Sequence, residues 1–187
     1  VSIAEFLKKG FIYHPNTFYE EIKTLDNGSY YILDFEKKKI IKKKYFEVTA
    51  NPTNDFEHLV KELSEALLKS IERRTLKFFG KKVIFLSGGS DSRMILANSV
   101  DTDTDAITLY NQDNYEIKIT KNIAKSLNIK HELIKRDKNY YLDSFDNSIK
   151  VNSGRSLPID DHFLNLKNDK KIKTYDTILT GCYADWL

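Results

Sequence analysis

The chain has 187 residues, of which 41% are hydrophobic and 30% are charged, a composition typical of a folded globular protein and not of a disordered or fibrous one. Lysine and arginine outnumber aspartate and glutamate by 30 to 27. Because so small an excess does not hold a polyanion, nucleic acid is not expected as a partner. No apolar run approaches the roughly 20 residues of a membrane-spanning helix, so a membrane is not expected either.

Cysteine and histidine usage narrows the chemistry further. The single cysteine, Cys182, excludes an intramolecular disulfide within these residues and suits a reducing compartment, so we expect a cytoplasmic protein. The histidines are scattered without the spacing of metal ligands, which argues against a zinc site.

The first part of the chain predicts a short helix followed by a pair of strands, Ser29–Phe35 and Lys39–Phe46. Between them lies a polar turn around Glu36 and Lys37. The run from Lys37 to Lys44 contains six lysines, which we interpret as the solvated edge of a hairpin whose charges discourage edge pairing. A phosphate-binding or membrane-binding patch is the alternative interpretation of this run.

A polar stretch with one proline, residues 49–55, is the best candidate for a domain boundary, which we place between residues 50 and 51. After it, apolar residues recur at helical spacing from Phe56 to Ile71, with Asn54 or Asp55 as the N-cap. We therefore expect a small first domain, residues 1–50, and a second domain over residues 51–187.

Short apolar runs then alternate with helical patterns. The expected strands are Lys82–Leu86, Ala106–Tyr110, His131–Ile134 and Thr177–Thr180, and the expected helices are Ser92–Val100, Glu116–Leu127 and segments within Tyr140–Lys167. This alternation predicts an α/β fold with a parallel, doubly wound sheet covered on both faces. Ligands of such sheets bind at the carboxyl ends of the strands.

The polar segment Ser87-Gly88-Gly89-Ser90-Asp91-Ser92 stands at one of these strand ends, directly before a helix. The two glycines tolerate positive φ and let backbone N–H groups approach a ligand without an intervening Cβ. Together with the helix N-terminus and the three hydroxyls, they form an anion cradle that suits a phosphate group. A plain turn with Asp91 as a helix cap does not account for the whole combination.

The nature of the anion follows from what the segment contains and lacks. It has neither the lysine of a Walker loop nor the spacing of a dinucleotide fingerprint. Asp91 would repel phosphates in a partly desolvated site unless a cation lay between them. We therefore expect Mg²⁺ to bridge Asp91 and the phosphate oxygens.

The segment matches the SGGxDS signature of the PP-loop ATP pyrophosphatases, which cleave ATP between its α and β phosphates. Residues 107–134 resemble the second strand-helix-strand unit of the asparagine synthases in that superfamily, and residues 178–185 resemble their loop that closes over the nucleotide. Residues 10–30 resemble the end of the glutaminase domain that precedes their synthetase domain. The resemblance implies an adenine nucleotide alpha hydrolase-like sheet, preceded by a small β remnant of a glutaminase-type domain.

The resemblance also implies roles for individual residues. The backbone near Phe85, Leu109 and Gly181 would frame the adenine and ribose, with Thr180 beside them. The pyrophosphate would be held by Ser87, Gly88, Gly89, Ser90, Asp91 and Ser92. Asp91 and Asp185 would hold Mg²⁺. No residue is assigned as catalytic, because Cys182 and Tyr183 replace the acidic residue and glycine of the family loop, and Trp186 replaces another acidic residue.

The implied function is an ATP-dependent ligase that converts a carboxylate into its acyl-adenylate, releases pyrophosphate and transfers ammonia or an amine. The expected partners are a small-molecule carboxylate and an amine donor, and a homodimer is compatible with this function. We expect the chain to be an incomplete part of such an enzyme, with a carboxylate or amine other than those of asparagine synthesis. The alternatives are a degenerate or truncated nucleotide-binding module and a PP-loop enzyme that modifies tRNA.

Overall fold

The computed structural model describes residues 2–49, 55–99, 103–153 and 157–181. The chain folds as two compact units, one formed by residues 1–54 and 144–162 and the other by residues 55–143 and 163–187. Helix α5 (Tyr140–Asn152) begins in the second unit and continues in the first. Among the described residues, no helix has both the length and the apolar character needed to cross a membrane.

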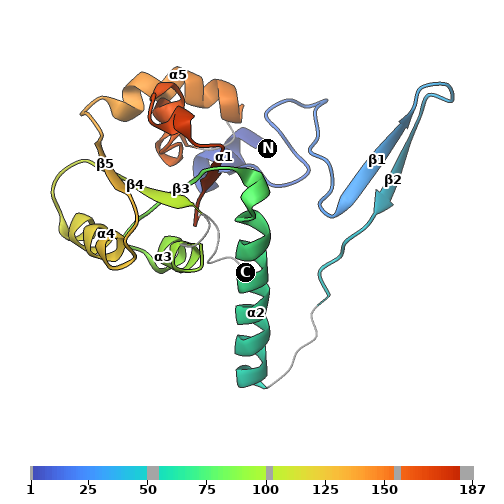
Figure 1. Cartoon of the computed structure of the whole chain (residues 1–187). Coiled ribbons are helices and arrows are strands. Elements are labelled where there is room, and N and C mark those ends of the chain that lie inside the picture. The colour runs from blue at the N-terminus through green and yellow to red at the C-terminus, as the bar shows by residue number, and fades with distance from the viewer. Residues whose placement is uncertain (1, 50–54, 100–102, 154–156, 182–187) are drawn as a thin grey trace. The chain divides into compact units, whose positions relative to one another are not determined.

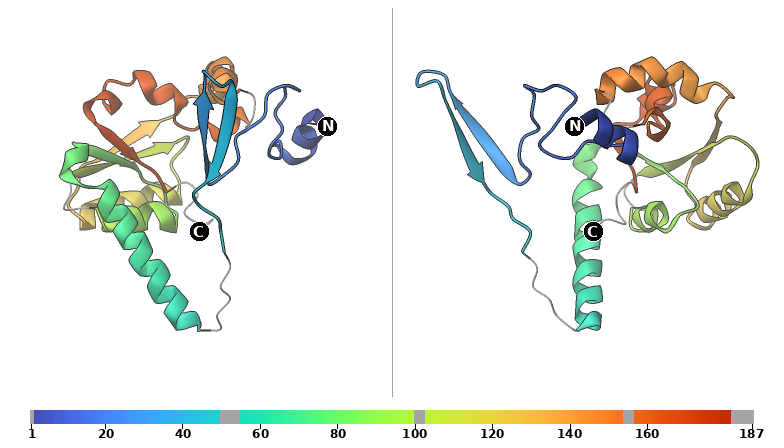
Figure 2. Two further views of the ribbon diagram at one scale, coloured as in Figure 1. Left: turned by 90° about the vertical axis from the view of Figure 1, so that its right-hand side faces the viewer. Right: turned by 180° about the vertical axis from the view of Figure 1, so that it is seen from behind.

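The first unit contains helix α1 (Ser2–Lys9) and an antiparallel hairpin of β1 (Ser29–Asp34) and β2 (Lys39–Lys44), seen from two sides in Figure 2. The predicted strand pair is confirmed, although β1 ends one residue and β2 two residues before the predicted limits. All six residues of β2 are exposed, as expected of a solvated lysine-rich edge.

A polar network surrounds the start of this hairpin. Asp26 accepts hydrogen bonds from the Tyr31 hydroxyl (2.6 Å) and His14 Nε2 (3.0 Å), and it pairs with Lys42 of β2. Lys42, Tyr31 and His14, in that order, hold the pKa of Asp26 far below its ordinary value. The network stabilises an exposed element that buries little apolar surface.

The second unit opens with helix α2 (Phe56–Arg74), whose N-cap is Asp55, one of the two predicted caps. The Asp55 side chain accepts a hydrogen bond from His58 N at 3.0 Å. The predicted apolar stripe is present, but Ile71 is its buried member, while Phe56 at the other end is exposed. The amphipathic pattern therefore identified the helix without indicating how much of its stripe would be covered.

A four-stranded parallel sheet forms the centre of this unit, with strand order β5-β4-β3-β6 (Figure 1). Its strands are β3 (Lys82–Phe85), β4 (Thr104–Tyr110), β5 (His131–Lys135) and β6 (Thr177–Leu179). Helix α3 (Ser90–Ala97) connects β3 to β4, and α4 (Tyr115–Ser126) connects β4 to β5. Each element lies within two or three residues of its predicted limits.

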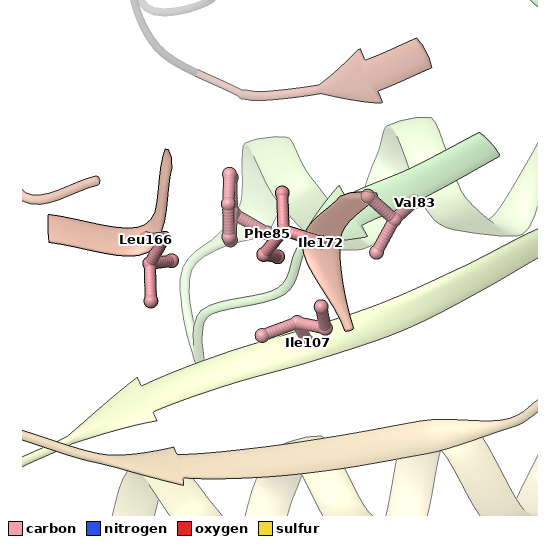
Figure 3. Close-up of a cluster of buried hydrophobic side chains, with 5 residues drawn as sticks. All are labelled: Val83, Phe85, Ile107, Leu166 and Ile172. Carbon is pink, nitrogen blue, oxygen red and sulfur yellow. The ribbon is translucent and has the colours of Figure 1, made fainter. Parts of the chain in front are cut away.

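Both faces of the sheet are covered. On one face, Ile84 and Leu86 pack with Leu96 of α3 and with Ile123 of α4. On the other face, Val83, Phe85 and Ile107 pack against Leu166 and Ile172 (Figure 3). The last two belong to the 3-10 turns η4 (Leu164–Asn168) and η5 (Ile172–Thr174). The further 3-10 turns are η1 (Lys77–Phe79) and η3 (Pro158–Asp160).

The α/β class with a parallel sheet covered on both faces is thus confirmed. The strand order also locates a switch point. The chain leaves β3 toward β4 on one side, while β6 joins β3 on the other. Ligands of open parallel sheets bind at such a point, outside the carboxyl ends of the strands. A ligand site is therefore expected at the loops after β3 and β6.

Candidate functional site

The loop after β3 occupies this switch point. All four residues of β3 are buried, and Leu86 N donates to Ile107 O at 2.8 Å, which extends the sheet pairing to the edge of the loop. Helix α3 then begins at Ser90, with Gly89 as its N-cap and no side-chain cap. The N–H groups of the first helical turn are thereby left for another acceptor.

Two serines brace the loop from within. Ser92, which is buried, accepts a hydrogen bond from Ser87 N at 3.0 Å, and the hydroxyls of Ser87 and Ser92 lie 3.0 Å apart. Ser87 Oγ also accepts from Gly89 N at 3.2 Å. These hydroxyls hold the backbone in a curve around the helix N-terminus, a supporting role that sequence reasoning did not separate from direct phosphate contact.

The more accessible side chains of the segment are those of Ser90 and Asp91. Ser90 is exposed and Asp91 is half-buried, and the Ser90 hydroxyl donates to Asp91 Oδ1 at 3.1 Å. A carboxylate at the mouth of an anion cradle fits an incoming cation better than a bare phosphate. The assignment of Asp91 as a Mg²⁺ ligand stays a prediction.

The glycines of this loop matter for their small size and not for unusual backbone angles. Gly89 has φ −73°, and the described glycines with positive φ are Gly10, Gly28 and Gly80, so the tolerance of positive φ noted for this pair is not used. A Cβ at Gly88 would lie 3.0 Å from Glu116 Cγ. Small size at this position admits a neighbouring side chain to the loop.

The loop after β6 meets the same helix end. A Cβ at Gly181 would lie 2.8 Å from Ser92 N and 3.0 Å from Asp91 Cβ, so the two loops pack backbone to backbone. Thr180 is exposed beside Gly181. The structure thus brings together residues that lie about 90 positions apart in the sequence, a spacing read from the residue numbers themselves. Cys182, Tyr183, Asp185 and Trp186 lie outside the described residues.

Glu116 is a contact of the loop that sequence reasoning missed. It lies in the first turn of α4, and its Oε1 accepts a hydrogen bond from Gly88 N at 2.9 Å. The carboxylate thus takes up one of the backbone N–H groups of the loop. Its position three residues after the exposed Asp113, in an ordinary acidic first turn, gives no sequence signal for this contact.

Phe85 and Leu109 were expected to frame the base through their backbone. Their side chains belong to the core on the face opposite α3, and the Phe85 ring stacks on Phe163 with ring centroids 3.8 Å apart. Phe85 ends β3, and Leu109 is the second-last residue of β4. Their backbone atoms therefore lie toward the carboxyl edge of the sheet, and their contact with a base stays a prediction.

A polar link across the strands supports the same edge. The Thr108 hydroxyl donates to Leu86 O at 2.8 Å and lies 2.9 Å from His131 Nε2. Burial, with a smaller contribution from Lys121, lowers the pKa of His131. A neutral His131 that carries its proton on Nε2 would satisfy this geometry, since the Thr108 hydrogen is already used.

Within the part of the chain that the structure describes, no three His, Cys, Asp or Glu side chains gather as a ready-made metal cluster. Mg²⁺ at a nucleotide site does not need one, because one or two carboxylates and the phosphates themselves supply its ligands. Asp91 and Glu116 are the described carboxylates at the loop, which fits this mode of binding.

No protein-family model matches the sequence, and no curated protein is significantly similar to it. Three solved structures resemble parts of it weakly. An NMN synthetase from Francisella tularensis has 23% identity and a TM-score of 0.38, and covers 63% of this chain and 52% of that one. An NH3-dependent NAD synthetase from Campylobacter jejuni, solved with nitrate, has 15% identity and a TM-score of 0.31, and covers 53% and 42%.

The third is a glutamine-dependent NAD+ synthetase from Acinetobacter baumannii, solved with ADP, with 19% identity and a TM-score of 0.32. It covers 72% of this chain and 25% of that one. The chain thus spans between a quarter and about half of the length of these structures. The function proposed for this chain therefore rests on the geometry of its own loops.

Proposed function

We propose that the chain binds ATP with Mg²⁺ at the loop after β3, as part of an enzyme that activates a carboxylate and converts it into an amide. One observation carries this proposal: the SGGxDS loop lies at the switch point of a parallel sheet, with Gly181 packed against its Asp91 and Ser92. A plain turn would not need a second glycine loop folded onto the same helix end.

The loop would hold the phosphates through backbone N–H groups. The first turn of α3 has no side-chain cap, and a negative group there is favoured by the N–H groups and by the helix dipole. Ser87 and Ser92 would keep the curve of the loop fixed through their mutual hydrogen bonds. Because these donors are positioned before the reaction, they need little reorganisation as charge develops.

In the proposed reaction, an oxygen of the carboxylate attacks the α phosphorus of ATP and the bond to the β phosphate breaks, so that pyrophosphate leaves. An amine nitrogen then attacks the acyl carbon, AMP leaves with the bonding pair, and the nitrogen loses a proton to form the amide. Mg²⁺, held by Asp91 and, as we expect, Asp185, would neutralise charge on the departing pyrophosphate. The carboxylate and the amine donor are the proposed small-molecule partners.

Phosphorus NMR of the reaction products tests this proposal. ATP, Mg²⁺ and ammonia are incubated with the protein and with carboxylic acids added one at a time, aspartate among them. We expect pyrophosphate and AMP to appear only when a suitable acid is present. Formation of ADP and orthophosphate would contradict cleavage between the α and β phosphates. Efficient turnover of aspartate would contradict the expectation of a different substrate.

A further inference from the structure

A cavity lined by polar and charged residues opens at the same edge of the sheet, two strands away from the loop after β3. Its volume is about 640 Å³, and its lining residues are Asn111, Lys135, Arg136, Asp137, Lys138 and Tyr141. Arg136 N donates to Tyr110 O at 2.7 Å, which places the residue at the carboxyl ends of β4 and β5. We call these six residues the basic pocket.

The charges of the basic pocket favour an anion. Its lining has three cations, Lys135, Arg136 and Lys138, against one carboxylate, Asp137. The Asp137 carboxylate accepts the N–H of Asn139 at 2.8 Å. Within the described ranges, none of the three cations forms an ion pair. A concave site with an excess of unpaired positive charge attracts anions.

Arg136 is held in place but incompletely satisfied. Its guanidinium carbon lies 5.9 Å from the Tyr140 ring centroid and 5.7 Å from that of Tyr141, and its Nη1 donates to the Tyr141 hydroxyl at 2.6 Å. Its Nε is buried and has no acceptor among the described residues. A guanidinium has five N–H donors arranged as a fork, so an oxyanion entering the pocket would supply the missing acceptors.

The distance between the basic pocket and residues 87–92, which we call the nucleotide loop, suggests which molecule carries this anion. In the strand order β5-β4-β3, one strand separates the end of β5 from the end of β3, and strands in a sheet are about 4.8 Å apart. The two sites are therefore separated by about 10 Å along one edge. A small molecule can reach both.

We propose that the basic pocket binds a second anionic group, a carboxylate or a phosphate, of the acid that is activated at the nucleotide loop. This inference rests on the proposed function. The reacting carboxylate would lie at the ATP α phosphate while Arg136 and Lys138 hold the other end of the molecule. A neutral acid would lack this second anchor, which makes the pocket a determinant of substrate choice.

The test follows backbone amide signals of the 187-residue chain during titration with inorganic phosphate and, separately, with succinate. Residues 135–141 report on the basic pocket, and residues 87–92 report on the nucleotide loop. We expect saturable shifts at residues 135–141, and the tighter of the two probes identifies the anion class. Arg136→Gln should weaken this binding about tenfold, since it removes a charge-assisted contact.

Matched variants separate a specific effect from a general one. Arg73→Gln removes the same charge from the exposed last turn of α2 and should leave the pocket affinity unchanged. Arg136→Lys keeps the charge but loses the fork and should bind with intermediate affinity. If Arg136→Gln proves unfolded by circular dichroism, Lys138→Ala takes its place, with exposed Lys125→Ala of α4 as its control.

The outcomes separate this inference from the proposed function. Shifts at residues 87–92 alone would overturn the basic pocket and leave the nucleotide loop standing. Shifts at residues 135–141 that Arg136→Gln does not weaken would also overturn it. A third titration, with Mg-ATP, tests the nucleotide loop. If the pocket binds phosphate or succinate while Mg-ATP leaves residues 87–92 unperturbed, the anion site stands but the proposed function fails. The role of the pocket in substrate choice then fails as well.

Discussion

The parallel sheet and the β1–β2 hairpin bury very different shares of their side chains. Every residue of β3 is buried, whereas every residue of β2 is exposed. The sheet is therefore stabilised mainly by apolar burial on both faces, and the hairpin by its backbone ladder and the polar network around Asp26. The loop after β3 follows the buried element of the two, whose packed neighbours would hold a site in place.

The largest expected effect is on the sheet core. Ile107 is 0% exposed and packs with Val83 and Phe85, so Ile107→Ala should lower the free energy of unfolding by about 3 kcal/mol. Ile40, in the hairpin, is 64% exposed, and Ile40→Ala should change the free energy of unfolding by less than about 0.5 kcal/mol. Urea unfolding measures both. Equal losses would mean that the two elements do not differ as described.

The next effect concerns the contact between the two glycine loops. A Cβ at Gly181 would meet backbone atoms of Asp91 and Ser92, so Gly181→Ala should cost about 1–3 kcal/mol of stability and also weaken Mg-ATP binding. At Gly88 the tightest contact of the added Cβ would be with Cγ of the flexible Glu116 side chain, at 3.0 Å, so Gly88→Ala should cost less. Thermal unfolding and calorimetry report the two effects. A larger loss of stability for Gly88→Ala than for Gly181→Ala would contradict the packing of the loops.

A smaller effect is expected from Glu116, which takes up the N–H of Gly88. In the absence of divalent cations, Glu116→Gln should tighten ATP binding about fivefold, because it removes a negative charge close to the phosphates. Glu65→Gln, on the exposed surface of α2, is the matched control. Unchanged or weaker ATP binding by Glu116→Gln in metal-free buffer would place the phosphates away from Gly88.

The smallest effects are those of pH, and they separate the two elements again. Burial lowers the pKa of His131 from its ordinary value of 6.5, so the folded protein binds fewer protons there than the unfolded chain. Stability should therefore fall as the pH is lowered below about 6.5. His131→Gln should remove this part of the pH dependence, which urea unfolding between pH 5 and about 7.5 would detect. An unaltered slope would contradict the account of His131.

Asp26, just before the hairpin, gives a pH dependence in the same direction but at a lower pH. Its pKa is lowered in the folded state by Lys42, Tyr31 and His14, so its stabilisation is present above the ordinary value of 3.8 and is lost as the pH falls below it. NMR titration of its carboxyl carbon shows whether the pKa is low. A normal value would remove the polar network as an explanation of the hairpin.

Sequence reasoning predicted those features that depend on local pattern. The apolar run before Ser87 and the change to helical spacing after it identified β3 and α3 within three residues, and the Asp55 cap was among the two predicted. Contacts between segments that lie far apart in the sequence could not be predicted from such patterns. Nothing near Glu116 indicates that it reaches Gly88, and Phe163 stacks on Phe85 from 78 positions away.

The basic pocket was missed for the same reason. In the sequence, Lys135-Arg136-Asp137-Lys138 has the composition of an ordinary solvated strand end. It becomes a site only because the turn into α5 brings Tyr141 beside Arg136 and the end of β4 brings Asn111. The sequence identified Gly88 and Gly89 for their tolerance of positive φ and their lack of a Cβ; the first is not used, while at Gly88 an added Cβ would lie 3.0 Å from Glu116 Cγ.

Binding of ATP to the parent chain and to Asp91→Asn, with and without Mg²⁺, tests the central claim most directly. The parent should bind ATP more tightly with Mg²⁺, and Asp91→Asn should bind Mg-ATP at least about tenfold more weakly than the parent. Without Mg²⁺, Asp91→Asn should bind ATP at least as tightly as the parent, because the carboxylate that repels the phosphates is gone. Asp146→Asn, on the exposed surface of α5, should behave as the parent does. Equal affinity of the parent and Asp91→Asn for Mg-ATP would contradict the assignment of the loop after β3 as the nucleotide site.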